Sequence, residues 1–191
     1  MKPIKLHTLS LSLALLGGVS PVYAQLMFSQ YIDGSSNRKG LEIYNPDAST
    51  VNLADYEIRQ FNNGEAVKFS AFALQGSLAS KAKFVIGRSE LKAVIGDKVN
   101  QVAGLSYNGD DALVLLYKGT RIDRFGRVGE QPIKGWGSSV SSIKNSFARL
   151  KKSNDVNSLD PKAAFDLESG WSNWSDQNAV ERYLGGATST P

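Results

Sequence analysis

The sequence predicts an all-β domain, either a sandwich or a barrel. Short runs rich in β-branched and aromatic residues recur about every ten residues, and clusters of Gly, Asn, Asp or Pro separate them. Several runs alternate apolar with polar side chains, which is typical of strands that cover a core with one face. With 191 residues, 41% of them hydrophobic, the chain is long enough to bury a proper core in one domain.

The first half of the chain is expected to form strands joined by turns. The expected strands cover residues 26–32, 41–44 and 51–60. The sequences Asp-Gly-Ser-Ser-Asn at 33–37 and Asn-Pro-Asp at 45–47 are typical of turns. Asn62-Asn63-Gly64 predicts a hairpin after the third strand, because Asn and Gly tolerate a positive φ.

Two later strands are expected to be buried on both faces, because residues 83–86 and 112–117 are apolar runs. Lys118-Gly119 predicts a turn into a further strand over 120–125. Between the apolar runs, residues 89–95 predict a short helix with Ser89 as its N-cap.

Beyond Gly129 the pattern is looser, and aromatic residues are scattered among Gly, Ser and Asn. These aromatic residues are Trp136, Phe147, Phe165, Trp171 and Trp174. Aromatics in such loops are expected to pin the loops to the core and not to bind a ligand.

The N-terminus has the three parts of a secretory signal peptide. Lys2 and Lys5 give it positive charge, residues 9–19 form an apolar core, and the segment 22–24 (Val-Tyr-Ala) suits a cleavage site before Gln25. An uncleaved membrane anchor is the alternative, but so short an apolar run is a poor transmembrane helix.

The expected organisation is therefore a signal peptide over 1–24, a domain over 25–186, and a flexible tail or the start of a linker over 187–191. The processed chain is expected in the periplasm, at the cell surface or in the medium, with no transmembrane segment.

The composition excludes most hydrolytic chemistry. The chain has no Cys, and its one histidine, His7, lies in the predicted signal peptide. A Ser-His-Asp triad, a Cys-His pair and a His- or Cys-ligated zinc site are therefore all excluded from the processed chain. Catalysis by two carboxylates could still use Glu42, but a small sandwich is a poor scaffold for it. We expect a non-catalytic protein, in which a buried Glu42 pairs with Arg59 or with backbone donors.

The segment Asn108-Gly109-Asp110-Asp111 has two interpretations. Asn108, Asp110 and Asp111 could supply oxygen ligands to Ca²⁺, joined by Asp33 or Asp123. The favoured interpretation is a turn in which these side chains bond to nearby backbone N–H groups. The spacing lacks the alternating acidic ligands of an EF-hand loop. No cofactor is expected, and calcium stays an open alternative.

Two basic groups raise the question of a polyanionic partner. The first group is Arg121, Arg124 and Arg127, and the second is Lys144, Arg149, Lys151 and Lys152. Cations interleaved with an aromatic such as Phe147 could follow a phosphate backbone. However, Asp123 and Asp155 interrupt the groups, and two of the charges behind the net +4 lie in the signal peptide. A solvated surface is the favoured interpretation, and extracellular DNA is the alternative.

The order of motifs resembles a lamin tail domain in its bacterial, exported form. The motifs are Phe28-Ser29-Gln30-Tyr31, Leu41-Glu42-Ile43-Tyr44-Asn45-Pro46, the segment 107–115, Phe125-Gly126-Arg127-Val128-Gly129, Trp136-Gly137 and Trp174. The resemblance implies an immunoglobulin-like β-sandwich. It also implies structural roles for the motif residues Glu42, Asn45, Gly109, Asp110, Trp136 and Trp174.

The resemblance says less about function. Bacterial domains of this kind are commonly attached to extracellular nucleases and phosphatases, whose catalytic residues they do not carry. The nuclease part needs histidines that this chain lacks. We therefore expect a binding or anchoring module for an unidentified protein or surface polymer. The alternative is an accessory domain that engages nucleic acid for an extracellular nuclease.

Overall fold

The structure is a computed structural model, and it describes residues 26–136, 146–149 and 160–174. The predicted signal peptide and tail lie outside these residues, as do Lys144, Lys151 and Lys152. Among the residues that are described, no helix is long and apolar enough to cross a membrane.

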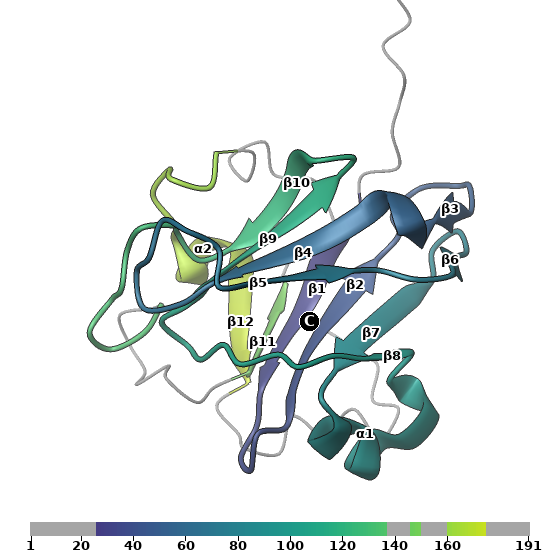
Figure 1. The fold of residues 1–191 in the computed structure, drawn as a ribbon, viewed down its shortest axis with the longest axis horizontal. Coiled ribbons are helices and arrows are strands. Elements are labelled where there is room, and N and C mark those ends of the chain that lie inside the picture. Colours follow the sequence, from purple (N-terminus) through teal and green to yellow (C-terminus); the bar gives the residue numbers. More distant parts are fainter. Residues whose placement is uncertain (1–25, 137–145, 150–159, 175–191) are drawn as a thin grey trace, which may run out of the picture.

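Two β-sheets form the body of the molecule (Figure 1). The larger sheet has the strand order β12 (Trp171–Trp174), β11 (Ser146–Arg149), β1 (Met27–Asp33), β2 (Lys39–Tyr44), β7 (Lys83–Gly87) and β8 (Gln101–Val102). The smaller sheet has the order β10 (Thr120–Phe125), β9 (Ala112–Tyr117), β4 (Tyr56–Phe61) and β5 (Ser70–Ala73). A short pair, β3 (Val51–Asn52) and β6 (Ser77–Leu78), lies at one corner. The remaining elements are the helices α1 (Ser89–Ile95) and α2 (Leu167–Gly170) and the 3₁₀ turns Leu53–Asp55 and Gly96–Lys98.

The core lies between the two sheets, as the alternating pattern predicts. Leu41 and Ile43 of β2 pack there with Ile58 of β4 and Leu113 and Leu115 of β9. The predicted sandwich is therefore confirmed. Apolar residues also cover parts of the outer faces, which explains the continuous apolar runs in β7 and β9.

A bulge in β1 sets which of its side chains face the core. Register along β1 shifts between Phe28 and Gln30. Phe28 and Tyr31, three positions apart, therefore both join the core cluster, and Gln30 lies opposite Glu42 on the outer face.

Two apolar clusters form outside the core. Helix α1 packs Leu91 and Ile95 on Ile32 and Val85, on the outer face of the larger sheet. On the outer face of the smaller sheet, a second cluster is formed by Ala112, Val114, Leu116 and Val128, with Phe61 packed against it.

Most of the predicted turns are present. Lys118 and Gly119 have φ values of 47° and 80° and join β9 directly to β10. Asn63 and Gly64 have φ values of 53° and 73°, but the connection continues to Phe69 before β5 begins. The N-cap prediction is wrong: Arg88 is the N-cap of α1, and Ser89 lies inside the helix with its hydroxyl donating to Glu90.

Candidate functional site

Part of the set of site residues predicted from the sequence gathers at one end of the smaller sheet, namely Asn108 to Asp111, Arg124, Arg127 and Trp136. We call this region the loop end and define it as the loops 62–69, 104–111 and 126–136 with the segment 160–166. Strands β4 and β10 finish there and β5 and β9 begin there, so these connections lie together (left side of Figure 1).

Asp111 joins its own loop, 104–111, to the loops 62–69 and 126–136. Its side chain is buried, with 2% of the residue surface exposed. Oδ1 accepts a hydrogen bond from the backbone N–H of Asn63 at 2.7 Å, and Oδ2 accepts one from Asn108 at 2.8 Å. The backbone carbonyl of Asp111 accepts a third from Trp136 Nε1 at 2.9 Å. This residue therefore fixes the relative positions of all three loops.

Backbone hydrogen bonds hold the segment 108–111 in a turn, although of its Asn and Asp side chains it is Asp111 that accepts backbone N–H groups. The Asp111 N–H donates to the Asn108 carbonyl at 3.0 Å, and the Gly109 carbonyl accepts from the Trp136 N–H at 2.9 Å. Asp110 Oδ2 accepts a hydrogen bond from Gln131 Nε2 at 2.9 Å. Through these contacts, Gly109, Asp110 and Trp136 join the loop 104–111 to the loop 126–136.

The proposed calcium ligands are arranged less favourably. Asp110 Oδ1 and Asn108 Oδ1 are buried without a hydrogen-bond partner, but Asp111 uses both of its oxygens on backbone N–H groups. Asp33 pairs with Lys39 at 2.5 Å, and Asp123 accepts the N–H of Phe28 at 2.7 Å. Within the described part of the chain, no three acidic, His or Cys side chains form a group that could hold a metal ion.

Calcium is accordingly expected to leave the thermal stability unchanged. A ligand that binds only the folded state raises the melting temperature once its concentration exceeds Kd. Melting curves in millimolar calcium and in chelator should coincide. A higher midpoint in calcium that Asp110→Asn abolishes would contradict the turn interpretation.

Burial raises the pKa of the Asp111 carboxyl above its ordinary value, and the N–H groups of Asn63 and Asn108 oppose that shift. A carboxyl with a raised folded-state pKa contributes more stability when protonated, so its contribution falls as pH rises through the folded pKa. We expect the free energy of unfolding of the natural chain to exceed that of Asp111→Asn by more near about pH 4 than near about pH 7. Chemical denaturation at both pH values measures it. A difference that grows toward neutral pH would contradict the raised pKa.

The first basic group does not form a continuous cationic surface. Arg124 is buried, and its guanidinium donates to the carbonyls of Gly126 and Ala164, each at 2.8 Å, while it lies over the Phe165 ring. Arg127 donates to the Lys162 carbonyl and pairs with Glu130 at 2.8 Å. Arg121 is exposed on β10.

Of the second basic group, Arg149 belongs to the residues that the structure describes. Arg149 ends β11 opposite Trp171, and Lys144, Lys151 and Lys152 lie outside the described residues. The motif residue Trp174 ends β12, opposite Ser146.

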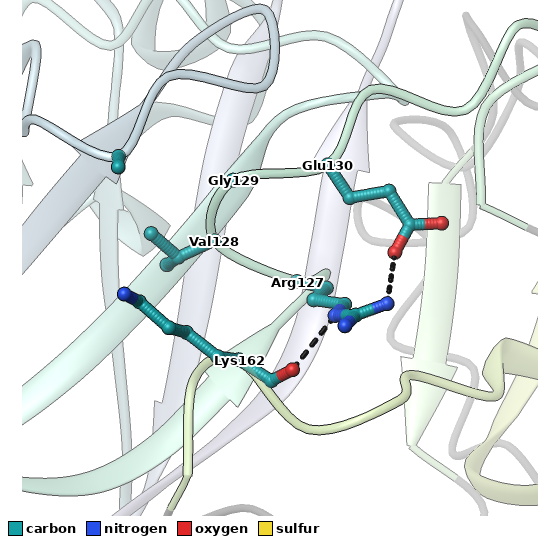
Figure 2. A pocket seen from close by; sticks show the side chains of 6 residues that line it. Arg127, Val128, Gly129, Glu130 and Lys162 are labelled. Carbon is teal, nitrogen blue, oxygen red and sulfur yellow. Dashed lines mark hydrogen bonds and ion pairs between the residues drawn. The ribbon is translucent and has the colours of Figure 1, made fainter.

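A shallow hollow of about 380 Å³ opens at the loop end. Its lining is Ala66, Arg127, Val128, Gly129, Glu130 and Lys162. Figure 2 shows Arg127 held between the Glu130 carboxylate and the Lys162 carbonyl, with the Lys162 side chain extended toward Val128. Of the three charged side chains that line the hollow, Arg127 and Glu130 therefore neutralise each other.

Glu42 lies outside this site, and Arg59, one of the partners predicted for it, does not pair with it. It is 1% exposed on the outer face of β2, where it accepts from Ser29 Oγ at 2.5 Å and Gln30 Nε2 at 3.3 Å and pairs with Lys83 at 3.3 Å. Arg59 belongs to the other sheet and pairs with Glu57. The motif residue Asn45 is also structural: its amide donates to the carbonyls of Ser49, Leu78 and Ala79, and its Oδ1 accepts the N–H of Asp47.

Sequence reasoning missed the exposed apolar side chains of the loop end. Val67 and Phe69 lie in the loop 62–69, and Ile133 lies in the loop 126–136. The signal was present in the sequence, because each of these apolar residues adjoins a lysine within a segment rich in turn formers.

Comparison with known proteins finds a family and a solved structure to which the chain is similar. The family model described as Lamin Tail Domain matches residues 20–129. Among solved structures, a DUF4876 family protein from Bacteroides thetaiotaomicron is similar, with 12% sequence identity, a TM-score of 0.46, and coverage of 82% of this chain and 70% of that chain. No curated protein matches the sequence. The family match contains β1 to β10, and β11 and β12 extend the larger sheet beyond it.

Proposed function

Because this chain belongs to the lamin tail domain family, we propose that it is an exported binding or anchoring module that acts at the cell surface or in the medium. The family is a non-catalytic, immunoglobulin-like one, and function in such a sandwich resides in sites added to the fold. The sequence supports export through its signal-like first 24 residues.

The observation that carries the binding assignment is how the loop end uses its polar groups. Asp111 and Arg124 have their charged groups directed to backbone N–H or carbonyl groups of neighbouring loops. Arg127 likewise donates to the Lys162 carbonyl and pairs with Glu130. These groups hold loops in place and are not paired as an acid and a base or as a nucleophile and its base. The loop end is thus suited to presenting a fixed surface to a partner.

Expression of the full chain in a bacterium tests the proposal. We expect a product that starts at Gln25, that leaves the cytoplasm, and that binds isolated cell envelopes in a sedimentation assay. Mass spectrometry of the N-terminus and fractionation give the first two results. An unprocessed cytoplasmic product, or one that envelopes do not retain above the level of an unrelated exported protein, would overturn the proposal.

The nucleic-acid alternative has less support, because Arg124 is buried on carbonyl groups and Arg127 is paired with Glu130. It depends on Arg121 and on the second basic group. A mobility-shift assay with DNA at low salt tests it, since contacts to phosphates give a steep salt dependence. Retention of DNA that Arg121→Gln weakens would favour this alternative over the anchoring role.

A further inference from the structure

Strand β5 forms one edge of the smaller sheet, on the side where the larger sheet ends in β8 (Figure 1). An edge strand presents unpaired backbone groups to any strand that approaches it, and proteins commonly protect such edges with charged residues or bulges. The opposite edge, β10, has both protections, because it carries Arg121, Asp123 and Arg124 and contains a shift in register. β5 has the uncharged sequence Ser-Ala-Phe-Ala and a regular register.

The pairing with β4 shows which backbone groups of β5 face outward. The N–H of Leu74 donates to the Tyr56 carbonyl at 3.0 Å, and backbone groups alternate in direction along an antiparallel strand. The even-numbered residues of β5 therefore direct their N–H and carbonyl groups to β4, and Ala71 and Ala73 direct theirs away from it. The side chain of Gln101 agrees with this alternation, because it reaches the Ala73 carbonyl from the outer side.

Gln101 occupies one end of this outer edge. Its Nε2 donates to the Ala73 carbonyl at 2.9 Å, and its Oε1 accepts from the N–H of Gln75 at 3.1 Å. A side-chain amide thus makes the two hydrogen bonds that a peptide group of a neighbouring strand would make. The edge is therefore geometrically able to pair with a further strand, and at this end it is already paired.

Phe69 adds an open acceptor at the other end. Its N–H donates to the Gln60 carbonyl at 2.7 Å, and Ser70 also pairs with Gln60. In a trans peptide the carbonyl lies opposite the N–H of the next residue, so the Phe69 carbonyl points outward. Within the described ranges, the edge groups without a hydrogen-bond partner are the Phe69 carbonyl, both groups of Ala71 and the N–H of Ala73.

These open groups are complementary to a second copy of the same edge. In an antiparallel pair of β5 strands with Ala71 opposite Ala71, each Ala71 N–H meets the carbonyl of the other Ala71. Ala73 of each copy lies opposite Phe69 of the other, and its N–H meets the open Phe69 carbonyl. The remaining groups at that position, the Phe69 N–H and the Ala73 carbonyl, already have partners within the chain. Every open group thus meets an open group.

Other occupants lose this match. With Phe72 opposite Phe72 in two copies, each Ala71 N–H would meet an Ala73 carbonyl, which Gln101 already occupies. An unrelated extended peptide would place its own N–H and carbonyl groups against the occupied positions, where they would stay unpaired at a cost. The pattern of donors and acceptors along the edge therefore favours a second copy of this chain.

The side chains of the edge fit the same register. Phe69 is 63% exposed, and in this register it lies opposite Ala73, whose small side chain leaves room for the ring. Ala71 and Ala73 are both exposed. Lys68, the charged residue nearest to the strand, lies opposite Leu74, so the lysines of the two copies do not oppose each other.

We propose that two copies of the chain associate by antiparallel pairing of their β5 strands about a two-fold axis at Ala71. The two smaller sheets then form one continuous sheet, and the dimer carries two loop ends. Two linked sites bind a surface more tightly than one without any new contact. This inference goes beyond the anchoring function and does not depend on it.

Sedimentation equilibrium of the purified chain tests the proposal, and reversible dimers that dissociate on dilution are expected. Ala71→Lys places like charges directly opposite each other at the axis and should raise the dimer dissociation constant about tenfold or more. Ala73→Lys is the matched control, because it adds the same charge to the same strand on either side of the axis. It should raise the dissociation constant about threefold or less.

A proline at the axis provides a second variant. Ala71→Pro removes an N–H that faces away from β4, and proline is tolerated at such positions of edge strands. The dissociation constant should again rise about tenfold or more, since both hydrogen bonds between the Ala71 residues are lost. Thermal melting of each variant shows that the fold is retained.

Cross-linking tests the register directly. The chain contains no Cys, so Ala71→Cys carries a single thiol. The two thiols of a dimer lie opposite each other, and a short bifunctional maleimide should join them into a covalent dimer. Thr120→Cys is the control, because Thr120 is exposed on β10, at the opposite edge of the sheet. It should stay monomeric under the same conditions.

The outcomes separate this proposal from the anchoring function. A chain that stays monomeric up to about 1 mM would overturn the dimer. Equal weakening by Ala71→Lys and Ala73→Lys, or equal cross-linking at 71 and 120, would overturn the pairing of β5 strands. A monomer that cell envelopes retain would overturn the dimer and support the anchoring function, and a dimer that envelopes do not retain would do the reverse.

Discussion

Replacing Gly126 by alanine is expected to lower the free energy of unfolding by about 3 kcal/mol or more. Gly126 has a φ of +79°, and a Cβ atom there would lie 2.8 Å from Trp136 Nε1 and 2.9 Å from the Asp111 carbonyl oxygen. The methyl group would thus separate the two partners of the hydrogen bond that fixes the loop 126–136 to the segment 104–111. Denaturant unfolding of both proteins measures the loss.

Gly129→Ala is the matched control for this prediction. Gly129 lies in the same loop with a φ of +87°, but no atom lies within 4 Å of the Cβ position. Its replacement should cost about 1 kcal/mol, which is the conformational cost alone. Equal losses in the two variants would mean that the contact with Trp136 contributes nothing beyond the backbone strain.

Replacing Asp111 by alanine is expected to cost about 3 kcal/mol at neutral pH. Two backbone N–H groups, those of Asn63 and Asn108, would lose their charged acceptor. The loop 62–69 would also lose this link to the loop 104–111. Chemical denaturation again gives the magnitude. In addition, hydrogen exchange at the Asn63 and Asn108 amides should accelerate, because these two groups would become free to exchange.

The neighbouring carboxylate supplies the control. Asp110 accepts a hydrogen bond from the exposed Gln131 side chain, and its Oδ1 is buried without a partner. Asp110→Ala should therefore cost less than about 1 kcal/mol. If Asp110→Ala destabilised the protein as much as Asp111→Ala, the two carboxylates would share one structural role, and the loop-joining role assigned to Asp111 would be wrong.

The sandwich and its turns could be predicted from the sequence because they depend on local physical preferences. Asn and Gly accept a positive φ more readily than other residues. Asn63, Gly64 and Gly119 all adopt one in the turns that the sequence predicts. The apolar runs 83–86 and 112–117 predict strands that are buried on both faces. Both strands do pack apolar residues on each face. The Asn108 to Asp111 turn was favoured for the same local reasons.

The partners of charged residues could not be predicted in this way. Register in β10 shifts between Arg121 and Asp123, which places Arg124 opposite Val114 and buries it. A bulge of one residue changes the face of every later side chain, and alternation alone does not reveal it. Glu42 was expected near Arg59, but the two residues belong to different sheets. The acceptor for the Asn63 N–H lies 48 positions away at Asp111 and is visible only in the folded chain.

The position of β1 has a consequence for how the chain folds. β1 is synthesised before β2 and β11, the two strands that flank it. The N–H of Phe28 in β1 donates to the carboxylate of Asp123, which lies 95 positions later in the sequence. Because such distant pairings must be closed before they contribute stability, folding is expected to be slow for a domain of this size. The core cannot be completed until the last strands of the larger sheet are available. A nascent chain therefore exposes β1, which is buried along its whole length in the folded domain, until β11 has been made.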